Sequence, residues 1–181
     1  MGQGADAART VRGDPSVVVN LHAKPYGWYA HHVHASDLHL TVTLCVFFRQ
    51  AKVAGARIGD ALAGRFSAAV SSAAAAAELP ADGIVPLAYG PSADSVRERS
   101  LSALGRALKA GYSGLWLVLL PAQAPTDGDG FDEVDLAWAH LTEHHPISVL
   151  CVLPLEEYAN RIPGWLRRRH AYYYSGGRLI R

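Results

Sequence analysis

The sequence predicts an α/β domain built as a three-layer sandwich, with a mostly parallel central sheet and helices on both faces. Two continuous apolar runs, 115–120 (LWLVLL) and 147–153 (ISVLCVL), are typical of strands that are covered on both faces. Segments with helical periodicity separate the predicted strands, and this alternation favours a parallel sheet. We expect one domain over residues 16–181, preceded by a flexible, polar tail over residues 1–15.

The first part of the domain contains two predicted strands and one long helix. Three consecutive valines favour a strand over 16–22, and a second strand follows over 28–34. Residues 38–54 are ambiguous, because their β-branched residues favour a strand whereas their length and the glycine at 55 favour a buried helix. We interpret them as a helix that begins at Ser36 and Asp37.

The remaining elements alternate more regularly. Strands are predicted over 56–63, 84–89, 115–120, 147–153 and 171–174. Helices are predicted over 67–79, over 92–110, from 131 onward after a loop at 122–130, and over 155–162. The helix over 92–110 has Leu101, Leu104 and Leu108 on one face, and Arg178 to Arg181 form a basic end.

The composition argues against several classes of partner. The formal net charge is +1, so no overall field draws the protein to nucleic acid or to anionic lipid, and we expect neither direct nucleic-acid binding nor membrane association. The two cysteines, Cys45 and Cys151, lie in apolar runs and indicate buried free thiols in a reducing compartment. Neither a signal peptide nor a transmembrane run is evident, so we expect a cytoplasmic protein.

Nucleotide-binding motifs are absent from the sequence. A phosphate loop needs glycines followed by Lys and Ser or Thr at a strand-to-helix turn. The first turn that could host one reads His34-Ala35-Ser36-Asp37, and the GxGxxG fingerprint is also missing. Nucleotide hydrolysis and a dinucleotide cofactor are therefore not expected, and the sequence identifies no other cofactor.

Histidines are the most conspicuous residue type. The chain has nine of them, and four fall within nine residues: His31, His32, His34 and His39. On a strand, His32 and His34 point to the same face, so two imidazoles could bind a metal or haem, with His144 and His145 as further ligands. Without HExxH, CxxC or a carboxylate at ligand spacing, hydrogen-bonded structural histidines are the default interpretation.

One segment offers a catalytic alternative. His39-Leu40-Thr41-Val42 matches the H-x-T-x motif of 2H phosphodiesterases. Such enzymes need two copies, so that two imidazoles flank a phosphate as acid and base. The second copy in this chain, His140-Leu141-Thr142-Glu143, lies on a predicted helix and has a glutamate where the motif wants an apolar residue.

Several short motifs follow one another between residues 27 and 171. They are Gly27-Trp28-Tyr29, His34-Ala35-Ser36-Asp37, Gly111-Tyr112-Ser113-Gly114-Leu115-Trp116, Val149-Leu150-Cys151, Tyr158 and His170. Their order resembles the MEDS domain, the methanogen/methylotroph sensory domain of bacterial and archaeal regulators. The family's histidine, tyrosine, arginine and second tyrosine are replaced here by Tyr29, His34, Trp116 and Leu153. The resemblance implies a RecA-like sheet without a phosphate loop, signal sensing coupled to transcription, an altered pocket and no catalysis.

The predicted site follows from the predicted sheet. Ligands in open α/β sheets bind beyond the carboxyl ends of the strands, which nominates the loops after His34, Tyr89, Leu120 and Leu153. The residues that we expect to bind a ligand are His32, His34, Ser36, Asp37, Tyr89, Trp116, Tyr158 and His170. The sequence thus predicts a non-catalytic module that senses a small molecule and acts through a regulatory protein partner or a homodimer.

Overall fold

The strands belong to one sheet in the computed structural model, which describes residues 18–19, 27–62, 64–80, 82–120, 129–157 and 172–180. They are β1 (Val18–Val19), β2 (Tyr29–His34), β3 (Arg57–Ala61), β4 (Ile84–Pro86), β5 (Leu115–Leu119), β6 (Ile147–Pro154), β7 (Tyr172–Ser175) and β8 (Arg178–Ile180). Their order across the sheet is β1-β8-β7-β2-β6-β5-β3-β4. The strands from β7 to β4 are mutually parallel, whereas β8 is antiparallel to both of its neighbours. The prediction of a mostly parallel sheet is confirmed.

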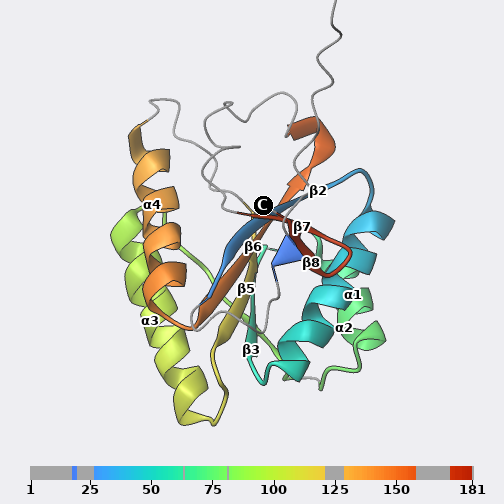
Figure 1. The fold of residues 1–181 in the computed structure, drawn as a ribbon, viewed down its shortest axis with the longest axis horizontal. Coiled ribbons are helices and arrows are strands. Elements are labelled where there is room, and N and C mark those ends of the chain that lie inside the picture. Colours follow the sequence, from blue (N-terminus) through green and yellow to red (C-terminus); the bar gives the residue numbers. More distant parts are fainter. Residues whose placement is uncertain are drawn as a thin grey trace, which may run out of the picture.

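Helices cover the sheet on both sides (Figure 1). Helices α1 (Asp37–Val53) and α2 (Ser67–Ala76) pack on one face, and α3 (Ala93–Lys109) and α4 (Asp129–His144) pack on the other. Because successive strand residues point to opposite faces, each layer of helices has its own core. Trp116 and Val118 of β5 face α1 and α2, while Leu117 and Leu119 face α3 and α4. This arrangement is the predicted three-layer sandwich.

The ambiguous segment over 38–54 is helical. Its cap, Ser36, accepts a hydrogen bond from the backbone N–H of His39 at 3.2 Å, and Asp37 places a negative charge in the first turn. Gly55, with φ +68°, adopts the left-handed conformation that ends many helices. Apolar side chains fill the sheet-facing side: Leu40, Leu44, Phe47, Phe48 and Ala51. The apolar residues that resembled a strand therefore form the inner surface of a helix.

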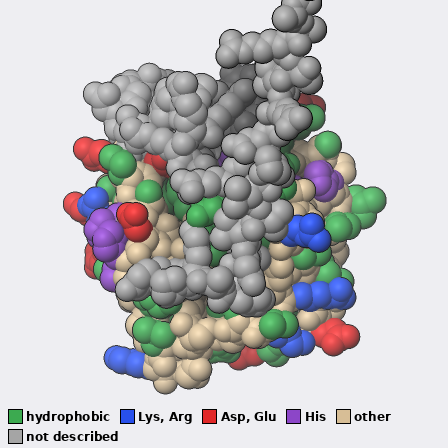
Figure 2. Space-filling view, viewed as in Figure 1, with side chains coloured by type: hydrophobic (Ala, Val, Ile, Leu, Met, Phe, Trp, Pro, Cys, Tyr) green, Lys and Arg blue, Asp and Glu red, His purple; other side chains and the backbone are tan. Residues whose placement is uncertain are grey.

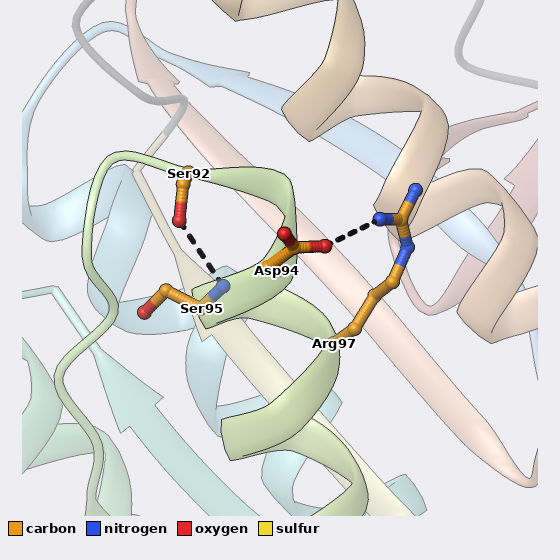
Figure 3. Close-up of polar contacts among 4 residues, drawn as sticks. All are labelled: Ser92, Asp94, Ser95 and Arg97. Atoms are coloured by element: carbon orange, nitrogen blue, oxygen red, sulfur yellow. Dashed lines mark hydrogen bonds and ion pairs between the residues drawn. The ribbon is translucent and has the colours of Figure 1, made fainter.

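Helix α3 begins as the sequence predicts but buries a different face. The hydroxyl of Ser92 accepts a hydrogen bond from the backbone N–H of Ser95 at 3.2 Å (Figure 3). Leu104 is buried, whereas Leu101 and Leu108 are 40% and 47% exposed. Small side chains face the sheet instead: Ser100, Ala103 and Ala107. Two of the three leucines therefore lie outside the buried face of α3, which small residues occupy instead.

The C-terminal hairpin was missed in part. The strand predicted over 171–174 is β7, but the expected basic end is strand β8. Gly176 and Gly177, with φ of +52° and +79°, connect the two strands, and paired glycines are typical of a two-residue hairpin turn. The predicted tail, most of the strand over 16–22 and the predicted helix beyond residue 157 lie outside the described residues.

Two other expectations concern the cysteines and membranes. Both thiols are free, Cys151 fully buried and Cys45 half-buried. Burial raises the pKa of the Cys151 thiol well above its usual value, so this thiol stays protonated. Among the helices of the described ranges, none combines the length and the apolar character that a bilayer crossing requires.

Candidate functional site

The predicted loop after β2 meets side chains from two other parts of the chain. His34 is the last residue of β2, and Asp37 is the first residue of α1. Phe66, just before α2, packs edge-on against His34 with 5.1 Å between ring centroids. The neighbouring Arg65 pairs with Glu157, which follows β6. We call these five residues the His34 cluster; they lie where the carboxyl ends of parallel strands meet.

His34 is the centre of this cluster and is unusual for a buried histidine. Its side chain is 4% exposed, and neither ring nitrogen has a hydrogen-bond partner within the described parts of the chain. A buried polar group left without a partner costs roughly 1–3 kcal/mol. A polar ring in such a position therefore calls for a reason beyond packing, and recognition of a bound molecule is one such reason.

The electrostatic surroundings keep the His34 ring neutral. Burial lowers the pKa of His34 and is the largest effect. The Ser36 backbone, which lies near the ring but outside hydrogen-bonding geometry, and the Asp37 carboxylate raise the pKa, while the positive charges of His39 and Arg65 lower it. A neutral imidazole presents one N–H donor and one nitrogen acceptor. The cluster can thus offer a ligand one donor and one acceptor on the same ring.

The amino end of α1 is poorly suited to a phosphate. Helix ends bind phosphate through free N–H groups and their partial positive charge. Here the N–H groups of His39 and Leu40 donate to the Ser36 hydroxyl and carbonyl at 3.2 Å and 3.0 Å. The Ala35 N–H points to His39 Nδ1 at 3.4 Å, and Asp37 adds a negative charge. The Ser36 cap and the Asp37 carboxylate therefore both act against an anion at this turn.

His32, which lies two residues before His34 and on the same face of β2, is already hydrogen-bonded. Its Nδ1 donates to the backbone carbonyl of Tyr174 at 2.9 Å, because a carbonyl can only accept. Its Nε2 then accepts from the Thr43 hydroxyl at 3.0 Å. Both nitrogens are used within the protein, so His32 has no ring nitrogen free for a ligand. These hydrogen bonds give His32 a structural role, and the expectation that it binds a ligand stays a prediction.

Two other predicted site residues lie away from the cluster. Trp116, the second residue of β5, is buried in the core beside Trp28 and Phe47, with centroid separations of 5.3 Å to each. Tyr89 packs on the opposite face of the sheet, edge-on to Trp138 at 5.0 Å. The structure therefore unites His34, Ser36 and Asp37 but separates Trp116 and Tyr89 from them. Tyr158 and His170 lie outside the described residues.

The 2H phosphodiesterase alternative conflicts with the fold. His39 lies at the start of α1 and His140 in α4, on opposite faces of the sheet. Figure 2 likewise shows histidine side chains on two opposite sides of the molecule, over α1 and over α3 and α4. Thr41 and Thr142 donate to backbone carbonyls of their own helices. The two motifs cannot flank one phosphate.

The described part of the chain contains no candidate metal site. No group of three or more His, Cys, Asp or Glu side chains there is placed to hold a metal ion. His140 and His144 do stack on each other at 4.2 Å, but Nδ1 of His144 is engaged with the carbonyl of His140 at 2.9 Å. These two rings behave as surface histidines of one helix.

Three members of the cluster were not predicted: Arg65, Phe66 and Glu157. Glu157 follows the strand over 147–153, so the loop nominated after Leu153 could have revealed it. Arg65 and Phe66 follow β3, whose sequence has a weak strand pattern, and the corresponding loop was not nominated. Comparisons with protein-family models, curated proteins and solved structures found no match. The resemblance to the MEDS domain remains a prediction.

Proposed function

We propose that the protein binds a small, neutral polar molecule at the His34 cluster and acts as a non-catalytic sensor. The proposal rests on the buried His34 ring, whose two nitrogens have no hydrogen-bond partner in the described ranges. A ligand that accepts from one nitrogen and donates to the other would recover the roughly 1–3 kcal/mol that each unpaired group costs. The site requires no covalent step for this purpose.

The surrounding side chains define the class of ligand. The cluster combines the positive charge of Arg65 with the negative charges of Asp37 and Glu157, so it does not select a strongly charged molecule. The Phe66 ring beside His34 supplies an apolar wall. These features favour a compact molecule that carries both donors and acceptors and has one apolar face.

A sensory role is supported by the resemblance to the MEDS domain and by the placement of the cluster. The Arg65–Glu157 ion pair joins the loop before α2 to the segment after β6. A ligand between His34 and this ion pair would contact the loop after β2, the loop before α2 and the segment after β6. It would bind more tightly to the conformation in which these three segments are correctly placed, and such a difference in affinity is what shifts a population of conformations. A regulatory protein partner or a second copy of the chain would then recognise that state.

The decisive variant is His34→Leu. If His34 serves a ligand, removing its unpaired nitrogens should stabilise the free protein by about 1–3 kcal/mol while abolishing binding. A structural histidine would behave oppositely, and His34→Leu would destabilise the protein. His144→Gln, a change at an exposed histidine of α4, is the matched control and should change neither property.

Binding is measured by thermal shift against fractions of a bacterial small-molecule extract. At a concentration a hundred times the Kd, a ligand adds about 2.7 kcal/mol, which corresponds to roughly 5–10 °C in a domain of this size. The wild type and His144→Gln should show this shift with the same fraction, and the bound compound should be recovered unchanged. A fraction that shifts His34→Leu equally, or an extract that shifts nothing, refutes the proposal.

A further inference from the structure

A cavity lies between α3 and the sheet, near the amino-terminal ends of β3 and β5. Its volume is about 250 Å³. Ala103, Ala107 and Ala110 of α3 line its helical side, and Val85 and Leu115 belong to its sheet side. Residues spaced by three and four positions share one face of a helix, so three methyl groups leave open a space that larger side chains would fill. We call this space the α3 pocket.

The polar border of the α3 pocket carries positive charge. Arg57 donates to the Tyr112 hydroxyl at 2.6 Å and to the Asp82 carbonyl at 2.7 Å, and Arg106 donates to the Ser102 hydroxyl at 2.8 Å. All of these partners are neutral, and the ion pairs found in the described ranges involve other arginines. Among the described residues, no acidic side chain lines the pocket. Two guanidinium groups thus border an apolar space without a carboxylate to balance them.

The end of α3 does not cancel this charge. The last carbonyls of a helix carry partial negative charge, which would oppose an anion. Here the carbonyl of Ala107 accepts from the N–H groups of Ala110 and Tyr112 at 3.1 Å, and the carbonyl of Leu108 accepts from Gly111 at 3.0 Å. These hydrogen bonds satisfy the carbonyls of Ala107 and Leu108, which would otherwise have no partner at the end of the helix. The arginines therefore dominate the electrostatic character of the pocket.

The volume limits the size of an occupant. One water molecule takes about 30 Å³ of liquid, so the pocket holds roughly eight non-hydrogen atoms. We propose that the α3 pocket binds a small amphipathic carboxylate, with its carbon chain against the alanines of α3 and its carboxylate between Arg57 and Arg106. This site is separate from the His34 cluster, which lies at the carboxyl end of the strands.

The test uses hexanoate and hexanamide, which have the same number of non-hydrogen atoms but differ in charge. Titration calorimetry of the purified full chain should show hexanoate binding at least about tenfold more tightly than hexanamide, because only hexanoate can pair with the arginines. Arg106→Gln, at an exposed position, should weaken hexanoate binding about tenfold. Arg97→Gln is the control on the same helix: Arg97 pairs with Asp94 near the helix start (Figure 3), so its loss should leave the affinity unchanged.

A second variant tests the location independently of charge. Ala107→Leu fills the pocket and should abolish hexanoate binding while the melting temperature stays the same or rises. His34→Leu should leave hexanoate binding unchanged, which separates this proposal from the proposed sensor function. Equal affinities for hexanoate and hexanamide, or unchanged binding in Arg106→Gln, would overturn the proposal even if Ala107→Leu failed to fold.

Discussion

Acidification should destabilise the protein through the buried His32 ring. This ring is 1% exposed and is held in its neutral form between the Tyr174 carbonyl and the Thr43 hydroxyl. A second proton would have to enter at Nε2, where it would break the bond from Thr43 and place a charge inside the core. Burial accordingly lowers the pKa of His32 from 6.5 to about 4.

The sign and size of the effect follow from this pKa difference. Between pH 6.5 and about 4 the unfolded chain binds a proton at His32 and the folded protein does not, so the free energy of unfolding falls as the pH falls. Each pH unit in this window is equivalent to about 1.4 kcal/mol. The total loss near pH 4 is therefore roughly 3 kcal/mol, a large part of the stability of an ordinary domain. At still lower pH both states are protonated at His32, and this contribution no longer changes.

Urea denaturation of the wild type and of His32→Gln, repeated from neutral pH down to about pH 4, measures this contribution. Gln cannot titrate, so the unfolding free energy of His32→Gln should fall by roughly 3 kcal/mol less than that of the wild type over the range. The comparison uses the slope of the unfolding free energy against pH, so a destabilisation by the substitution that is the same at every pH does not affect it. His144→Gln, at an exposed site, should follow the wild type. Parallel curves for the wild type and His32→Gln would refute the argument.

Three further substitutions test the packing around the sheet. A Cβ at Gly27 would lie 1.5 Å from the carbonyl oxygen of Ile147, so Gly27→Ala should prevent a cooperative thermal transition, and a native-like melting curve would contradict this close approach. Tyr29→Phe removes the 2.7 Å hydrogen bond to the buried Asp135 carboxylate and should cost about 1–3 kcal/mol in urea denaturation; a neutral effect would show that this bond contributes nothing. Ser92→Ala removes the cap of α3 and should cost about 1 kcal/mol by the same measurement, whereas an unchanged midpoint would exclude a capping role.

Local signals were sufficient to predict most of the secondary structure. Ser36 and Ser92 mark helix starts through their own side chains, and Gly55 marks a helix end through its backbone freedom. Such signals act within a few residues and are readable in the chain. The buried face of α3 is different, because it depends on which side of the helix faces the sheet and α4. Leu101 looks like a core residue, but only the fold shows that alanines occupy the contact.

The site was predictable where it follows from strand direction. The rule that ligands bind at the carboxyl ends of parallel strands identified His34, Ser36 and Asp37, which the structure places together. Trp116, which comes from the resemblance to the MEDS domain, lies buried in the core instead, because an aromatic residue in an apolar strand has the same pattern whether it lines a pocket or fills a core. The pairing of Arg65 with Glu157 joins residues 92 positions apart, and no periodicity in one sequence records such a contact.

The way in which α1 begins has a consequence for what the molecule can recognise. In a phosphate loop, the backbone N–H groups of a single turn bind the ligand. The binding groups and the helix end therefore form one rigid unit. Here the Ser36 hydroxyl occupies one N–H donor of that turn, and the Asp37 carboxylate places a negative charge beside it. In the function that we propose, recognition falls instead to side chains from separate loops, His34 and the Arg65–Glu157 pair. On this proposal, a ligand held between these loops fixes them relative to one another, and the resulting shift between conformations is the signal that a partner protein reads.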